Sequence, residues 1–109
     1  MNKLKKKPIC KYDFAKEFSK TPGPRYRKLG EFSGEAYRDD ILRGLLEEYE
    51  VIEIDGSGIE TSFTPSFLSE AFSPLSKEMG GFDNLNKRIK LFSLNNPNLE
   101  KKFKDFASL

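Results

Sequence analysis

The sequence predicts an α/β domain built on a mixed four-stranded sheet, with an N-terminal hairpin plus two parallel strands, packed with about three helices. Apolar residues recur at helical spacing in three segments, and two short β-branched or alternating runs lie between them. A length of 109 residues, with 37% hydrophobic and 33% charged residues, leaves room for one modest core. We therefore divide the chain into a basic flexible arm, residues 1–7, and a single domain, residues 8–109.

The hairpin is predicted from the first thirty residues. An apolar and aromatic run over residues 9–14 favours a strand. The next segment, Thr21-Pro22-Gly23-Pro24, fits neither a helix nor a central strand, because its two prolines lack N–H donors. The chain turns there, and residues 26–29 are expected to return as a second, edge strand.

The first helix is expected to begin at Ser33, a typical N-cap residue. Seven apolar residues follow on one helical face: Ala36, Tyr37, Ile41, Leu42, Leu45, Leu46 and Tyr49. The opposite face, which includes Arg38 and Asp39, is interpreted as solvated. Residues 51–54 then form a β-branched run that predicts a buried strand ending at Asp55.

Two further helices and one strand are predicted in the second half. Thr64-Pro65 is a helix-start signal, and Gly80-Gly81 is a stop signal. Pro74 lies between them and removes a helical hydrogen bond, so we expect a kink or two helical pieces. Residues 88–94 alternate like a strand, parallel to 51–54, and the Asn96-Pro97 signal precedes a terminal amphipathic helix.

The composition excludes most catalytic chemistry. The chain has one cysteine, Cys10, and no histidine, so zinc-finger spacings, histidine triads and Cys-His nucleophile pairs are absent. No carboxylates are spaced for a metal or acid–base site. We therefore expect no catalytic residues, no cofactor and no metal. No apolar window is long enough to span a membrane, and no signal peptide is recognised, so we expect a cytoplasmic protein without membrane contact.

Charge is unevenly distributed along the chain. Residues 1–30 carry a net charge of +8, residues 31–60 a net charge of −8, and residues 61–109 a net charge of +2. Two interpretations stay open, since opposite blocks attract and blocks of one sign repel. The blocks either create an electrostatically directed surface, or a basic edge folds against an acidic helix.

Several segments together resemble a known family. The segments are 22–27 (PGPRYR), Gly30, 33–35 (SGE), 52–55 (IEID) and 65–72 (PSFLSEAF). They are similar to the STAS-like domains of unknown function, distant relatives of the anti-sigma-factor antagonists, over roughly residues 9–94. The resemblance implies a STAS-like fold and a non-enzymatic switch or adaptor domain that binds a regulatory protein, often an ATPase or kinase relative in bacterial signalling.

The resemblance also implies a docking surface around residues 63–76. Anti-sigma-factor antagonists carry a phosphorylatable serine where the helix after the central strand opens, and Ser66 lies at about that position. Their Asp-Ser-Ser-Gly pattern is replaced here by Thr64-Pro65-Ser66-Phe67. Independently of the resemblance, a serine stripe shares one face of this helix, and Phe63 and Phe67 are the expected aromatic anchors at its rim. The stripe consists of Ser66, Ser69, Ser73 and Ser76. A simple solvated helix face is the alternative.

The sequence is also compatible with two other functions, anion sensing and nucleic-acid binding. Arg25 and Arg27, with Ser33 and Gly34 at a helix start, could form an anion pocket for a nucleotide or phosphate sensor. The alternative is that these arginines pair with acidic residues such as Asp40. The lysines at positions 3–7 could contact nucleic acid, but the −8 segment would repel a polyanion, so nucleic acid is a weak candidate.

Overall fold

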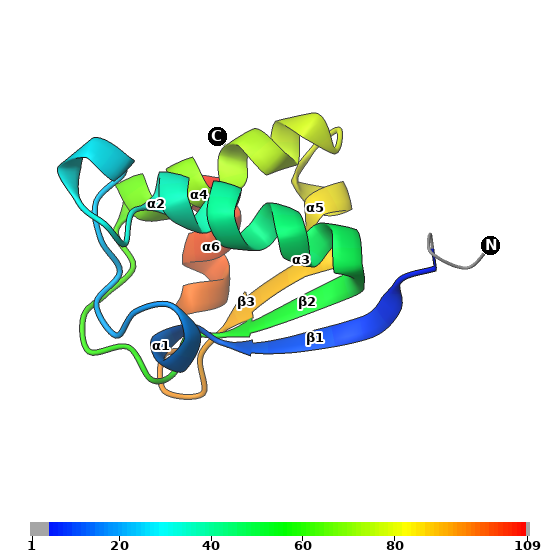
Figure 1. Cartoon of the computed structure of the whole chain (residues 1–109). Helices are drawn as coiled ribbons and strands as arrows, with labels where there is room; N and C mark the ends of the chain where they lie inside the picture. The colour runs from blue at the N-terminus through cyan, green and yellow to red at the C-terminus, as the bar shows by residue number, and fades with distance from the viewer. Residues whose placement is uncertain (1–4, 109) are drawn as a thin grey trace.

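The computed structural model describes residues 5–108, and its centre is a three-stranded parallel sheet in the order β1-β2-β3. The strands are β1 (Lys7–Asp13), β2 (Tyr49–Asp55) and β3 (Ile89–Phe92). Helices gather over one face of this sheet, as Figure 1 shows. The α/β class and the parallel pairing of the last two strands are confirmed.

The predicted N-terminal hairpin, and with it the mixed four-stranded sheet, is wrong for the described residues. β1 pairs in parallel with β2, with Ile9 opposite Val51 and Tyr12 opposite Ile54. The expected return strand is instead one 3₁₀ turn, η1 (Arg27–Leu29). A backbone hydrogen bond explains the difference. Gly23 N donates to Phe32 O at 2.9 Å, so the proline segment pairs with the residues just before α2 and not with β1.

β1 begins at Lys7, which was assigned to the flexible arm, and residues 1–4 of that arm lie outside the described residues. The Lys6 ammonium donates to the carbonyl of Leu46 at 2.9 Å. β1 ends in one helical turn, α1 (Phe14–Glu17), because the Asp13 carboxylate accepts from Lys16 N at 3.2 Å and caps that turn. Phe14, expected in the strand, opens α1 and is buried.

The first crossover is the helix predicted after Ser33. It runs through α2 (Gly34–Ala36), the π-helical segment η2 (Tyr37–Leu42) and α3 (Arg43–Glu48). Ser33 is its N-cap, since its Oγ accepts from Ala36 N at 3.0 Å. Gly34 lets this helix approach the next one closely, because a Cβ there would lie 2.6 Å from the carbonyl oxygen of Phe67.

The second crossover contains α4 (Pro65–Glu78) and α5 (Phe82–Arg88). The predicted start of α4 is confirmed, because Thr64 Oγ1 accepts from Phe67 N at 3.1 Å. The expected break at Pro74 is absent, and α4 is one helix. The carbonyl that Pro74 leaves without a helical donor belongs to Glu70, and Arg38 Nη1 donates to it at 2.6 Å.

The sequence pattern does not predict α5, because Gly80-Gly81 indicates a helix stop and the next predicted element is the strand over residues 88–94. The two glycines have positive φ values of 90° and 131°, and they redirect the chain into this second helix. β3 follows α5 without a gap. The predicted terminal helix is α6 (Leu99–Ala107), which packs against α4 and β3.

The core is an aromatic layer between the sheet and the helices. Phe14 lies at its centre, with ring centroids 4.9 Å from Tyr37, 4.8 Å from Phe63 and 5.8 Å from Phe67. Edge-on ring contacts of this kind add about 0.5–1.5 kcal/mol each beyond the burial of their area. These contacts join α1, η2, α4 and the loop before α4 into one packed core.

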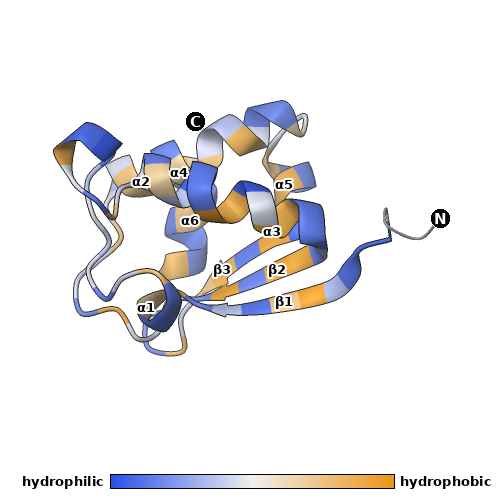
Figure 2. Cartoon of the chain, in the orientation of Figure 1, coloured by the Kyte–Doolittle hydropathy of each residue, from blue (hydrophilic) through white to orange (hydrophobic). Residues whose placement is uncertain are grey.

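The other face of the sheet carries no helix among the described residues (Figure 1). Its strands alternate, with buried Ile52 and Ile54 toward the helices and partly exposed Glu53 away from them. Orange and blue segments also alternate along part of β2 (Figure 2). The predicted strand over 51–54 is confirmed, but only one of its faces is fully buried.

Candidate functional site

Ser66 lies exposed in the first turn of α4, where the sequence placed it. Its neighbours on the preceding loop, Thr61, Ser62 and Thr64, are exposed as well. Ser69, one turn later, is half-buried. The beginning of α4 therefore presents hydroxyl groups to solvent, and the prediction of a partner surface stays open for this part of the helix.

The rest of the predicted docking surface is wrong, because its residues are inaccessible. Phe63 and Phe67, the expected anchors, are 2% and 0% exposed and belong to the aromatic layer. Ser73 and Ser76 are 5% and 4% exposed. The cause is that α4 packs against α2 and η2 and also against α6, so the serine stripe does not form a solvated face.

Two loops meet at the carboxyl ends of β2 and β3. Leu94 N donates to Ser57 Oγ at 2.7 Å, and the Asn95 side-chain amide donates to Ser57 O at 2.8 Å. A cleft of about 160 Å³ lies between the loops. Hydroxyl and amide groups line most of its rim, and Leu94 beside it is 81% exposed. Open α/β sheets bind ligands outside the carboxyl ends of their strands, so this end is a candidate site.

The predicted anion pocket is wrong, because its donors are already used. Ser33 is buried and caps α2, while Gly34 N donates to Pro24 O at 2.9 Å. Arg27 forms a two-bond pair with Asp40, whose closer N···O distance is 2.7 Å, and Arg25 lies 3.6 Å from a Glu70 carboxylate oxygen. The alternative prediction, that these arginines pair with acidic residues, is confirmed for Arg27.

These contacts also decide between the two interpretations of the charge blocks. Lys7 pairs with Glu48 at 3.2 Å, and Arg27 pairs with Asp40, so the first basic block folds against the acidic block. Each pair is exposed and weak by itself. The Arg27 hydrogen bond lowers the pKa of Asp40, so this carboxyl stays charged further into the acid range.

Arg38 has a structural role that the sequence did not reveal, and its predicted place on a solvated face is wrong, because its side chain is largely buried. Its guanidinium is 11% exposed and donates to both the carbonyl and the carboxylate of Glu70, at 2.6 and 2.7 Å. It also pairs with Asp39 at 2.9 Å, which lowers the pKa of that carboxyl. The signal was Pro74, which implied an unpaired carbonyl at Glu70, but nothing in the sequence indicated which donor would reach it.

The single thiol and the buried phenols are poor nucleophiles. Burial raises the pKa of Cys10, Tyr12 and Tyr37, so their reactive anions are disfavoured near neutral pH. Within residues 5–108, no group of acidic or cysteine side chains is placed to hold a metal ion. None of the helices described is both long enough and apolar enough to cross a membrane.

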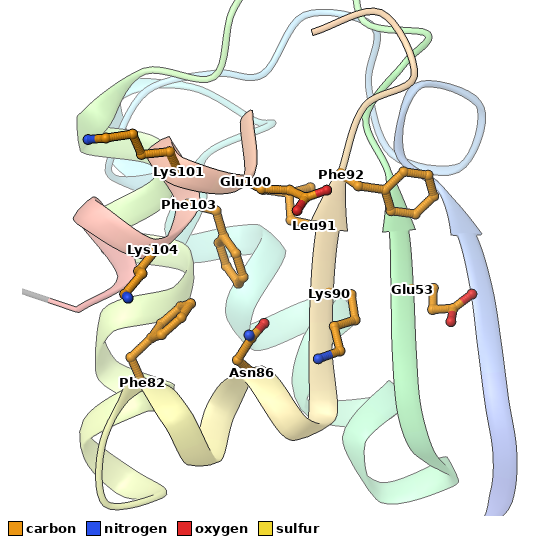
Figure 3. A pocket seen from close by; sticks show the side chains of 10 residues that line it. All are labelled: Glu53, Phe82, Asn86, Lys90, Leu91, Phe92, Glu100, Lys101, Phe103 and Lys104. Carbon is orange, nitrogen blue, oxygen red and sulfur yellow. The ribbon is translucent and has the colours of Figure 1, made fainter. Parts of the chain in front are cut away.

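A larger groove lies on the outer side of β3 (Figure 3). It has a volume of about 540 Å³ and is bordered by β3, α5 and α6. Phe82 and Phe103 lie side by side there, with ring centroids 5.3 Å apart. No sequence pattern pointed to this groove, because its walls come from three elements that only the fold brings together.

Comparison with known families gives one match. The model of the family described as "STAS-like domain of unknown function (DUF4325)" matches residues 33–99, more than half of the chain. Neither the search of curated proteins nor the search of solved structures found a match. The matched segment runs from the N-cap of the first crossover helix to the start of α6, and so contains β2, α4 and β3. The resemblance seen in the sequence is confirmed, and this chain belongs to the STAS-like domain family.

Proposed function

We propose that this chain is a non-enzymatic regulatory domain that binds a partner protein through the carboxyl end of its sheet. One observation carries the proposal: two neighbouring loops are exposed at that end. We call their exposed residues the tip surface, and it comprises residues 61, 62, 64–66 and 94–98. The surface combines hydroxyl and amide groups with one strongly exposed apolar side chain, that of Leu94.

The tip surface is held in shape from beneath. Phe63 lies within the exposed run and Phe67 directly after it, but both point into the core, where each packs against Phe14. A surface fixed in this way loses little conformational entropy when a partner binds. The two phenylalanines thus support the tip surface without contacting the partner, which reverses the role that the sequence suggested for them.

Phosphorylation of Ser66 is the proposed switch. A phosphate would add about 1.5 to 2 negative charges at pH 7, next to the positive end of the α4 dipole. Ser66 and Glu70 are four residues apart on α4 and therefore neighbours on its surface. A phosphate on Ser66 would compete with Glu70 for Arg25, and it would have to be desolvated under a bound partner. Both effects favour release of the partner.

Affinity capture from the native host tests the proposal, with ATPase or kinase relatives as the expected partner class. Wild-type chain and Ser66→Ala should retain the same partner, Ser66→Asp should lose it, and Leu94→Ala should weaken it. Glu47→Ala is the control, because Glu47 is exposed on α3 beside the amino end of β2. Intact mass of the recovered chain should show a population carrying one phosphate group.

The proposal is contradicted if Ser66→Asp and Leu94→Ala retain the partner as well as wild type does. It is equally contradicted if Glu47→Ala alone releases the partner, because that would move the contact to the opposite end of the sheet. Circular dichroism of each variant confirms that it is folded before its binding is compared.

A further inference from the structure

The cleft at the carboxyl ends of β2 and β3 has polar walls from three elements. Ser57 lies on the loop after β2, while Ser93 and Asn96 lie on the loop after β3. Lys102 lines the cleft from α6. Open α/β sheets bind ligands outside the carboxyl ends of their strands, so the side chains that converge here are candidate ligand contacts.

The hydrogen bonds of the cleft leave its neutral side chains free to donate. Ser93 Oγ accepts from the backbone N–H groups two and three residues later, both at 3.1 Å, so both of its lone pairs are used and its hydroxyl hydrogen remains. Ser57 Oγ accepts from Leu94 N at 2.7 Å and keeps its hydrogen in the same way. Asn96 Oδ1 accepts from Asn98 N at 3.0 Å, which leaves the amide nitrogen of Asn96 as a donor.

Lys102 adds a positive charge to these donors. Within the described residues, no carboxylate lines the cleft, and half-buried Lys102 forms no ion pair closer than 4.0 Å. Asp105, the next acidic residue on α6, pairs with Lys101 at 2.8 Å. Hydrogen bonds from an ammonium group to an anion are stronger than those between neutral groups. The charge and the donors of the cleft therefore favour an anion.

The size and shape of the cleft suit one phosphate group. Its volume of about 160 Å³ corresponds to about five waters at about 30 Å³ each, whereas pockets for drug-sized ligands measure about 300–1,000 Å³. The floor is closely packed, because a Cβ at Gly56 would lie 2.9 Å from the ring of buried Phe63. Donors on three walls match a tetrahedral phosphate group, which presents three acceptor oxygens, better than a carboxylate, which presents two.

We infer that this cleft binds a phosphate group, as a free ion or as part of a small molecule. Lys102 pairs with its negative charge. The hydroxyls of Ser57 and Ser93 and the amide of Asn96 donate to its oxygens. The cleft is separate from the anion pocket that the sequence predicted, whose donors are already used. The inference does not rest on a partner protein, because phosphate binding is measured on the chain alone.

Phosphate titration followed by amide NMR tests this inference on the full chain. Inorganic phosphate is added at constant pH and ionic strength, with chloride as the control anion. We expect phosphate, and not chloride, to give saturable shifts in residues 56–58, 61–62 and 93–96. Lys102→Met should weaken phosphate binding by about tenfold, because it removes the charged donor. Lys104→Met is the matched control, since it removes the same charge from α6 outside the cleft and should leave the affinity unchanged.

Asn96→Asp is a second variant that preserves the local fold. The aspartate retains an oxygen that accepts from Asn98 N, but it replaces the amide donor with a negative charge. Phosphate binding should therefore be lost. Methyl phosphate distinguishes the two sources of the phosphate group. Binding as tight as that of inorganic phosphate would support a group carried by a small molecule, and weaker binding would support a free ion.

The inference is overturned if phosphate shifts do not saturate, or if they lie outside the cleft. It is also overturned if Lys104→Met weakens binding as much as Lys102→Met, or if Asn96→Asp binds phosphate as well as wild type does. These outcomes are independent of partner capture. Loss of phosphate binding leaves the proposed partner surface standing, and failure to capture a partner leaves the phosphate site standing.

Discussion

The two faces of the sheet differ in what covers them. On one face, Tyr12, Ile52 and Leu91 are buried beneath the aromatic layer and the helices. On the other face, Ile9 is 48% exposed, and charged residues form a row across the three strands. Parallel sheets are usually covered on both faces. Stability therefore resides in the covered side, while the open face and the loops at the carboxyl end of the sheet are exposed.

The largest expected effect is on the covered side. Phe67→Ala should destabilise the domain by about 3–5 kcal/mol, because it removes a fully buried ring from the aromatic layer. Its neighbour supplies the control, since Ser66→Ala at an exposed position should change stability by less than about 0.5 kcal/mol. Urea unfolding followed by circular dichroism measures both. Equal effects of the two substitutions would contradict the division between the aromatic layer and the tip surface.

The second effect concerns the contact that keeps α4 continuous. Arg38→Met should cost about 1–3 kcal/mol, because it leaves the Glu70 carbonyl and carboxylate without their donor. In a Pro74→Ala background the residue 74 N–H can donate to that carbonyl, so the cost of Arg38→Met should be smaller. A double-mutant cycle from urea unfolding measures the coupling. Strict additivity would show that Arg38 does not compensate for Pro74.

Local sequence patterns correctly predicted two helix starts and the parallel pairing of two strands. Ser33 and Thr64 were identified as N-caps, and their side chains make the expected hydrogen bonds. The parallel pairing of β2 and β3 followed from a strand, helix and strand in succession. The family resemblance was also readable, because the segments that carry it lie largely within the matched region, residues 33–99.

Features that depend on distant contacts were not predictable. The sequence did not reveal that β1 pairs with β2, because a two-proline turn between two apolar runs is also typical of a hairpin. Burial of Ser73 and Ser76 required knowing that α6 packs on α4. Predicting that α4 continues through Pro74 required knowing that Arg38, 36 residues earlier in the chain, donates to the Glu70 carbonyl. In each case the deciding partner lies far away in the sequence.

A smaller effect is expected on the open face. Glu53→Lys should destabilise the domain by about 1 kcal/mol or less, because it places three lysines in one cross-strand row. Added salt should reduce the loss, since the row is partly exposed and screening weakens its repulsion. Thermal unfolding at low and high ionic strength measures both quantities. A loss as large as that of Phe67→Ala would show that the open face is part of a packed core.

The smallest effect is expected from acid. Hydrogen bonds from Arg43 and Arg38 lower the folded-state pKa of Glu78 and Asp39. Their stabilisation is therefore complete above the ordinary carboxyl pKa values of 4.5 and 3.8, and it is lost as pH falls through the lowered values. Both carboxylates are more than a third exposed, so the change is modest. Unfolding midpoints between pH 7 and 3 should fall less steeply in Glu78→Gln than in wild type, and an identical slope would exclude this ion pair as a contributor.

Site-specific photo-crosslinking shows whether a partner contacts the carboxyl end of the sheet. A photoreactive residue is placed at position 62, 66 or 94 on the tip surface, and at position 47 near the opposite end, in chains expressed in the native host. We predict that one protein is crosslinked from the three tip positions and not from position 47. Crosslinking of that protein from position 47, with none from positions 62, 66 and 94, would contradict the claim.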